Sequence, residues 1–126
     1  MKNNGLRIAL YGMLVLLSFT SFAQQAVQGG TPEQRAEHQT ARMKEKLNLS
    51  AEQETTVAAI NLKYAKQMQP LIDSGKRSIS VAQQARGIMK SKDEELKGVF
   101  SKEQYKEYQQ LKEEFKSEFK QKRRNN

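Results

Sequence analysis

The chain has no cysteine and no tryptophan among its 126 residues, and only two prolines. Without cysteine it cannot form a disulfide, a thiolate metal site or a cysteine nucleophile. Small domains often depend on disulfides for stability. Because this chain has no cysteine, its fold must be held by packing alone. Apolar residues are also scarce, at 37% of the chain. A chain of this size buries a modest fraction of its surface, so we expect a homodimer that completes the core.

Long hydrophobic runs are missing as well. The longest mostly apolar run, Ile8–Phe19, has 12 residues, whereas a membrane-spanning helix needs about 20. Lys2 and Arg7 precede this run, and the small residues Ser21 and Ala23 follow it. This pattern predicts a signal peptide that is cleaved after Ala23 and exports the chain to the periplasm. An uncleaved N-terminal anchor is the alternative.

The predicted mature chain is basic. Loss of Lys2 and Arg7 lowers the formal net charge from +8 to +6, an excess that attracts acidic partners. Export argues against nucleic acid as that partner, and we expect contact with membranes only as transient surface binding. The length permits one domain. We expect residues 1–23 to be the signal peptide, 24–30 a linker, 31–121 a helical domain and 122–126 a basic tail.

Three stretches carry the pattern of a helix start. Ser50 is followed by Gln53, Ser101 by Gln104, and Thr31 by Gln34. In such a capping box the hydroxyl accepts from the backbone N–H three residues on, and the glutamine side chain returns to the backbone of the capping residue. Before the first serine, Leu49 is expected to face the core, whereas Phe100 before the second can pack on Tyr105 as a hydrophobic staple.

Apolar spacing of three and four residues extends each start into a helix. The first is expected to end near Leu47, and Pro70 should kink or end the second. A turn at Asp73–Lys76 then leads to a third helix that starts at Ser78 or Ser80 and ends at Gly98. The fourth, from Ser101, frays into the basic tail. No segment alternates like a strand, so the sequence predicts an all-α fold of four helices in an open hairpin or cradle arrangement.

Few groups in the sequence favour catalysis. His38 is the only histidine, and the acidic run Asp93–Glu95 lacks the spacing of a calcium loop. Ser50 and Ser101 already have capping roles, and a serine nucleophile needs a nearby base. We therefore expect no enzyme activity, no metal site and no cofactor.

The paired motifs resemble those of a known family. Leu49-Ser50-Ala51-Glu52-Gln53 and Phe100-Ser101-Lys102-Glu103-Gln104 lie 51 residues apart behind a predicted signal peptide. They are similar to the LTxxQ motifs of the Spy/CpxP family of periplasmic stress proteins, with serine in place of threonine and, in the second copy, phenylalanine in place of leucine. The resemblance implies a curved helical homodimer that shields unfolded proteins without ATP. Other members of the family bind an envelope-stress sensor domain or influence metal tolerance.

The composition is compatible with such a chaperone. Positive charge speeds the encounter with a client, and scattered flexible apolar side chains supply modest affinity. Unfolded proteins are the expected partners. We expect the client contacts among Lys76, Arg77, Arg86, Lys90, Lys92, Met68 and Met89.

Overall fold

The computed structural model describes residues 30–125. The predicted signal peptide, its cleavage after Ala23 and the linker up to residue 29 lie outside this range. The side chains of Phe119, Lys122 and Arg123 also lie outside the description.

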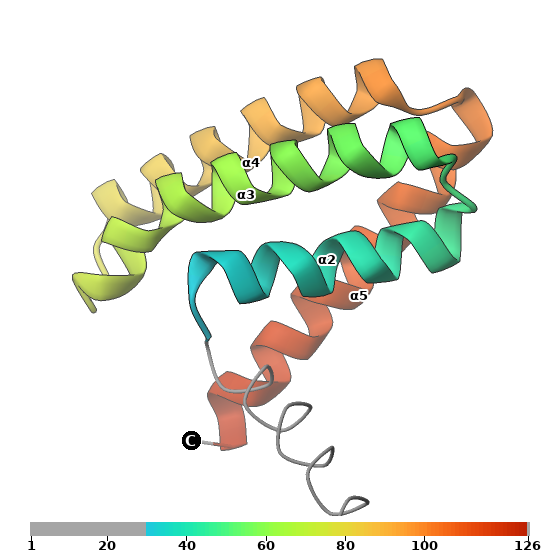
Figure 1. The fold of residues 1–126 in the computed structure, drawn as a ribbon. Coiled ribbons are helices and arrows are strands. Elements are labelled where there is room, and N and C mark those ends of the chain that lie inside the picture. Colours follow the sequence, from blue (N-terminus) through green and yellow to red (C-terminus); the bar gives the residue numbers. More distant parts are fainter. Residues whose placement is uncertain (1–29, 126) are drawn as a thin grey trace, which may run out of the picture. The chain divides into compact units, whose positions relative to one another are not determined.

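Four α-helices make up the described part of the chain, which has no strand. They are α2 (Pro32–Leu47), α3 (Ala51–Asp73), α4 (Ile79–Val99) and α5 (Lys102–Asn125) (Figure 1). The predicted all-α class is confirmed. None of these helices is long and apolar enough to cross a membrane.

The three capping boxes form as the sequence predicts. Thr31 caps α2, Ser50 caps α3, and Ser101 stands before α5, with each hydroxyl accepting from the N–H of the glutamine three residues on, at 3.1–3.2 Å. Ser78, one of the two predicted starts, caps α4 by accepting from the N–H of Val81 at 3.2 Å.

Two helix ends differ from the sequence positions considered for them. Of the two outcomes predicted at Pro70, a kink or an end, the end does not occur: α3 continues to Asp73, because the N–H of Ser74 donates to the carbonyl of Pro70 and resumes the helical pattern past the proline. α4 passes through Gly98 and ends at Val99, where Phe100 turns extended immediately before the next cap. The third boundary also moves, since α5 runs to Asn125 instead of fraying at the basic tail.

The turn between α3 and α4 lies where the sequence places it. Gly75 has a φ of +59°, a left-handed conformation that glycine adopts without a steric penalty. Asn48, which ends α2, is also left-handed at φ 50°, and asparagine tolerates this conformation better than most residues.

Packing is concentrated near the two motifs. α3 lies between α2 and α4, and α5 packs against α2 (Figure 1). Leu49 is buried as expected. Phe100, which the sequence predicts to pack on Tyr105, is also buried, and its ring centre lies 5.5 Å from that of Tyr108. Leu49 and Phe100 belong to a single cluster together with Met43, Leu47, Val57, Ile60, Tyr64, Leu96, Tyr108 and Leu111.

The other end of the α3–α4 pair, residues 65–91, is named here the distal hairpin. Arg35, near the start of α2, donates to Gln69 Oε1 at 2.6 Å and to the carbonyl of Ala65 at 3.4 Å. The last turn of α3 and the first turns of α4 therefore extend past α2 (Figure 1). No residue of the distal hairpin is buried.

Removing both motif caps is expected to destabilise the fold. Ser50→Ala together with Ser101→Ala should lower the free energy of unfolding by about 1 kcal/mol per cap, because two helix starts lose an acceptor for a backbone N–H. Thermal unfolding followed by circular dichroism measures the effect. Ser91→Ala, an exposed position within α4, is the control and should stay within about 0.5 kcal/mol of wild type. A double variant that melts like wild type would contradict the capping role.

Candidate functional site

The two motif glutamines contact each other. Gln53 Nε2 donates to Gln104 Oε1 at 2.8 Å, and Gln104 Nε2 donates back to Gln53 Oε1 at 3.1 Å. Each Oε1 also accepts from the backbone N–H of its own capping serine, at 3.1 Å from Ser50 and 3.0 Å from Ser101. The repeated motifs, 51 residues apart in sequence, thus meet at one point of the fold, named here the motif junction.

The junction also holds the ends of the preceding helices, in a crossed pattern. Gln53, which starts α3, donates to the carbonyl of Val99 at the end of α4, at 3.1 Å. Gln104, in the first turn of α5, donates to the carbonyl of Leu47 at the end of α2, also at 3.1 Å. Carbonyls at helix C-termini lack intrahelical donors, so these two bonds satisfy them. The sequence predicted the caps but not the pairing of the two glutamines. The one signal for it in the sequence was the recurrence of glutamine at the same position of both motifs.

Lys92 does not reach the surface. Its side chain is only 4% exposed, and its Nζ donates to Gln39 Oε1 of α2 at 2.6 Å. Burial lowers the pKa of Lys92 to about 8, which the negative charge of Asp93 only partly opposes. The prediction that Lys92 contacts clients therefore does not fit its position, because the apolar stripe of α4 continues through the lysine and carries it between helices.

A second buried polar contact lies beside the core. Asn61 is fully buried, and its Nδ2 donates to Thr40 Oγ1 of α2 at 3.0 Å. Thr40 in turn donates to the carbonyl of Ala36 at 2.8 Å. These polar positions link α2 to α3, and the sequence reasoning missed them because helical periodicity alone does not separate a buried polar residue from an exposed one.

The acidic run that was considered as a cation site divides between two neighbouring helices. Asp93 accepts from the Tyr108 hydroxyl at 2.6 Å and pairs with Lys112, both on α5. Glu95 accepts from the Tyr64 hydroxyl of α3 at 2.7 Å and pairs with Lys63. Burial, together with the bond to Asp93, raises the pKa of Tyr108, and the bond to Glu95 raises that of Tyr64. These carboxylates link helices to one another.

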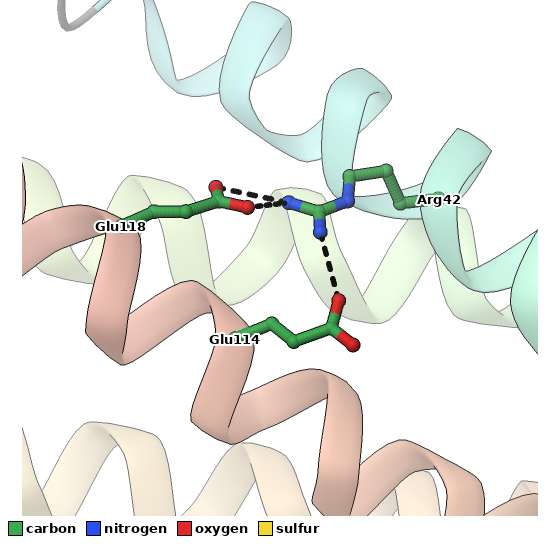
Figure 2. A network of polar contacts seen from close by, with 3 residues as sticks. All are labelled: Arg42, Glu114 and Glu118. Carbon is green, nitrogen blue, oxygen red and sulfur yellow. Dashed lines mark hydrogen bonds and ion pairs between the residues drawn. The ribbon is translucent and has the colours of Figure 1, made fainter.

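Arg42 binds two carboxylates of α5. Its guanidinium contacts Glu118 at 2.9 Å and Glu114 at 3.2 Å, as Figure 2 shows, and it lies 4.4 Å from the centre of the Phe115 ring. Both glutamates thereby hold α5 against α2. Glu113, in contrast, pairs with Lys116 of its own helix at 2.8 Å.

The remaining predicted contact residues lie on the distal hairpin. Lys76, Arg77, Arg86 and Lys90 are exposed, Met89 is 39% exposed, and Met68 is half-buried. The large apolar side chains that are exposed in the described chain are Met89, Ile72 (51%) and Ile79 (80%), and all three belong to this hairpin. Sequence reasoning missed both isoleucines, although each flanks the predicted turn.

Basic residues outnumber acidic ones in the distal hairpin, whose one acidic residue, Asp73, follows Ile72. The stretch Ser74–Lys92 contains five basic residues and no acidic one. With Lys92 buried, the other four display their charge beside the exposed apolar side chains. This exposed set, comprising Ile72, Lys76, Arg77, Ile79, Arg86, Met89 and Lys90, is named here the distal surface.

Ligand groups for a metal do not gather anywhere in residues 30–125. No three histidine or acidic side chains lie close enough together to hold an ion. His38 is exposed on α2.

Within residues 30–125, these features define an all-α arrangement of four helices, which paired glutamines join at one end and which has no buried residue in the distal hairpin at the other. Residues 23–108 match the family model described as "Domain of unknown function (DUF4890)", and the chain belongs to this family. The match includes both motifs and the distal hairpin. No curated protein and no solved structure shows a significant match.

Breaking the motif junction is expected to destabilise the protein in a coupled way. Gln53→Ala or Gln104→Ala should each cost about 1–3 kcal/mol of unfolding free energy, since each leaves the partner amide and a helix-end carbonyl unpaired. The double variant should cost less than the sum of the single variants by at least about 0.5 kcal/mol. Denaturant unfolding measures all three, with the exposed Gln110→Ala as control. Additive effects would show that the two glutamines act independently.

Replacing Lys92 by methionine is expected to stabilise the protein at pH 7, by about 1–3 kcal/mol, because the cost of burying a charge disappears. The pKa of about 8 lies below the ordinary 10.5, so the unfolded state binds more protons between these values. Wild-type stability therefore rises with pH across this window relative to Lys92→Met, and the advantage of the variant shrinks.

Unfolding at several pH values measures this difference. The control is Lys90→Met, an exposed change on the same helix, which should show little effect and no such pH dependence. A Lys92→Met variant that is less stable than wild type at pH 7 would show that the lysine contributes more through its Gln39 bond than its burial costs.

Proposed function

We propose that this protein is an exported, ATP-independent chaperone that binds unfolded or stress-damaged envelope proteins and limits their aggregation. The distal surface is the proposed contact site, without Lys92, which is buried. Periplasmic location and homodimer formation are parts of the same proposal. They rest on the signal-peptide pattern and the sparse apolar composition.

The observation that carries the proposal is the composition of the distal surface. Ile79 is 80% exposed and Ile72 51%, which is unusual for large aliphatic side chains. Four exposed cations lie in the same hairpin, and the stretch Ser74–Lys92 holds no acidic residue, although Asp73 follows Ile72. Unfolded acidic chains offer both complements: negative charge that speeds the encounter, and apolar segments that add modest affinity. Met89 adds a flexible contact that adapts to different sequences.

The position of this surface also suits a chaperone. It lies on the distal hairpin, which has no buried residue, so binding there leaves the core at the motif junction undisturbed. Weak, dispersed contacts of this kind let a client dissociate and fold.

The resemblance to the Spy/CpxP family supports the same function. Both motifs keep the apolar residue, the hydroxyl and the glutamine at the family spacing. The family also suggests a different partner, the sensor domain of an envelope-stress kinase. An acidic folded domain would use the same four exposed cations, so this regulator role is the second candidate. Metal tolerance gains no support from the described residues.

Residues 24–126 are expected to suppress the aggregation of an acidic client without ATP, and the suppression should weaken as salt screens the cations. Light scattering at equimolar chaperone in low and high salt measures this effect. Ile79→Ser should reduce suppression at both salt concentrations, because it removes apolar contact. Arg86→Gln with Lys90→Gln should remove the salt-sensitive part. Because these side chains are exposed, the variants should melt like wild type.

The charge control is Lys46→Gln with Lys106→Gln, which removes the same charge from exposed positions on α2 and α5. It should suppress aggregation like wild type. If wild type suppresses aggregation in neither buffer, the chaperone proposal fails. A saturable complex with one envelope protein in a pull-down would then favour the sensor-partner role.

A further inference from the structure

A second basic feature lies between the α3–α4 turn and the C-terminal half of α5. It is a hollow of about 580 Å³. Arg77 contributes to it from the turn, and one face of α5 supplies the rest: Glu113, Lys116, Ser117, Lys120 and Arg124. This set is named here the basic hollow.

Cations outnumber acids in the basic hollow by four to one. The single acid, Glu113, is already bound to Lys116 at 2.8 Å. Arg77, Lys120 and Arg124 have no ion-pair partner among the described side chains. Many cations elsewhere in the fold have one: Arg42 binds Glu114 and Glu118, Lys63 binds Glu95, and Lys112 binds Asp93.

Helix stability does not explain this arrangement. Lys116, Lys120 and Arg124 follow one another at i,i+4 spacing, and like charges at that spacing destabilise a helix. The helix dipole favours cations only within the last turn, which reaches Arg124 but not Lys116 or Lys120. Arg77 adds a further positive charge from a separate element. Within the described chain, the cluster therefore has too few acidic partners to balance its positive charge.

The lining indicates which kind of ligand fits. No residue of the basic hollow has an apolar side chain, so the hollow differs from the distal surface and offers nothing to an apolar client segment. Guanidinium groups bind phosphate oxygens in bidentate geometry, and lysines add point charges. The Ser117 hydroxyl is a further donor. The volume lies within the range of small-ligand sites and exceeds what one small ion needs.

We propose that the basic hollow binds a phosphate-bearing polyanion. The phosphates belong either to a free polyphosphate chain or to the headgroups of an anionic lipid surface, since both present several charged oxygens to the same cations. Arg77 is shared with the distal surface, so a ligand in the hollow and an acidic client compete for that one residue. The proposal does not depend on the chaperone function.

Calorimetric titration of residues 24–126 with inorganic tripolyphosphate at low salt tests the free-phosphate source. Lys120→Gln with Arg124→Gln should weaken binding about tenfold, because two charge-assisted contacts are lost. Lys102→Gln with Lys106→Gln is the matched control, since both lysines are exposed on the same helix outside the hollow. This control should bind like wild type. Melting curves of both variants should match wild type, because all four side chains are exposed.

Flotation with vesicles tests the lipid source. The protein should float with phosphatidylglycerol vesicles but not with phosphatidylcholine vesicles, and the Lys120→Gln, Arg124→Gln variant should lose this association. Binding of either probe that depends on Lys120 and Arg124 supports the proposal and identifies the source. Equal weakening in the control variant would indicate unspecific attraction to a basic protein and overturn it, as would the absence of binding to both probes.

The outcome separates from that of the proposed function. The Lys120→Gln, Arg124→Gln variant retains every residue of the distal surface, so client suppression should persist in it. Failure of tripolyphosphate and vesicle binding leaves that suppression unaffected, and failure of suppression leaves the anion measurements unaffected.

Discussion

The paired amides of Gln53 and Gln104 are the interaction on which the arrangement of the four helices depends. Each glutamine completes a cap and binds the other glutamine. Gln53 also donates to the last carbonyl of α4, and Gln104 donates to the last carbonyl of α2. Four helix termini therefore converge on two side chains. The repeated capping motif thereby also forms a tertiary contact. Leu49 and Phe100, the residues before the two caps, belong to the buried cluster.

The distribution of buried residues in the described chain follows from the position of the motif junction. The buried cluster surrounds the junction end, whereas the distal hairpin has no buried residue and extends past α2. Regions with few buried apolar contacts open at lower free energy than the core, so the distal hairpin is expected to open more easily than the junction end. A contact surface at that end can adapt to a partner while the junction keeps the fold.

Charge is divided according to the same geometry. Near the core, carboxylates join helices: Asp93 reaches α5, Glu95 reaches α3, and Glu114 and Glu118 hold Arg42 of α2. These links occupy four of the acids, and no cation of the distal surface has an ion-pair partner among the described side chains. The two basic surfaces differ in character, since the distal surface mixes cations with apolar side chains and the lining of the basic hollow is wholly polar.

The sequence by itself determined the all-α class, the helix starts at Thr31, Ser50 and Ser101 and the burial of Leu49, because capping and periodicity are local. It left the start of α4 open between Ser78 and Ser80, and the structure has Ser78. It did not decide between a kink and an end at Pro70, and it placed the end of α4 at Gly98 instead of Val99, since a helix end depends on the contacts made by the next few residues of the chain. Only the tertiary structure decided that Lys92 is buried, that the glutamines pair and that Arg77 lines the same hollow as Lys120. Each of these three features depends on which helices pack against each other. That packing brings together residues far apart in sequence, and local patterns do not specify it.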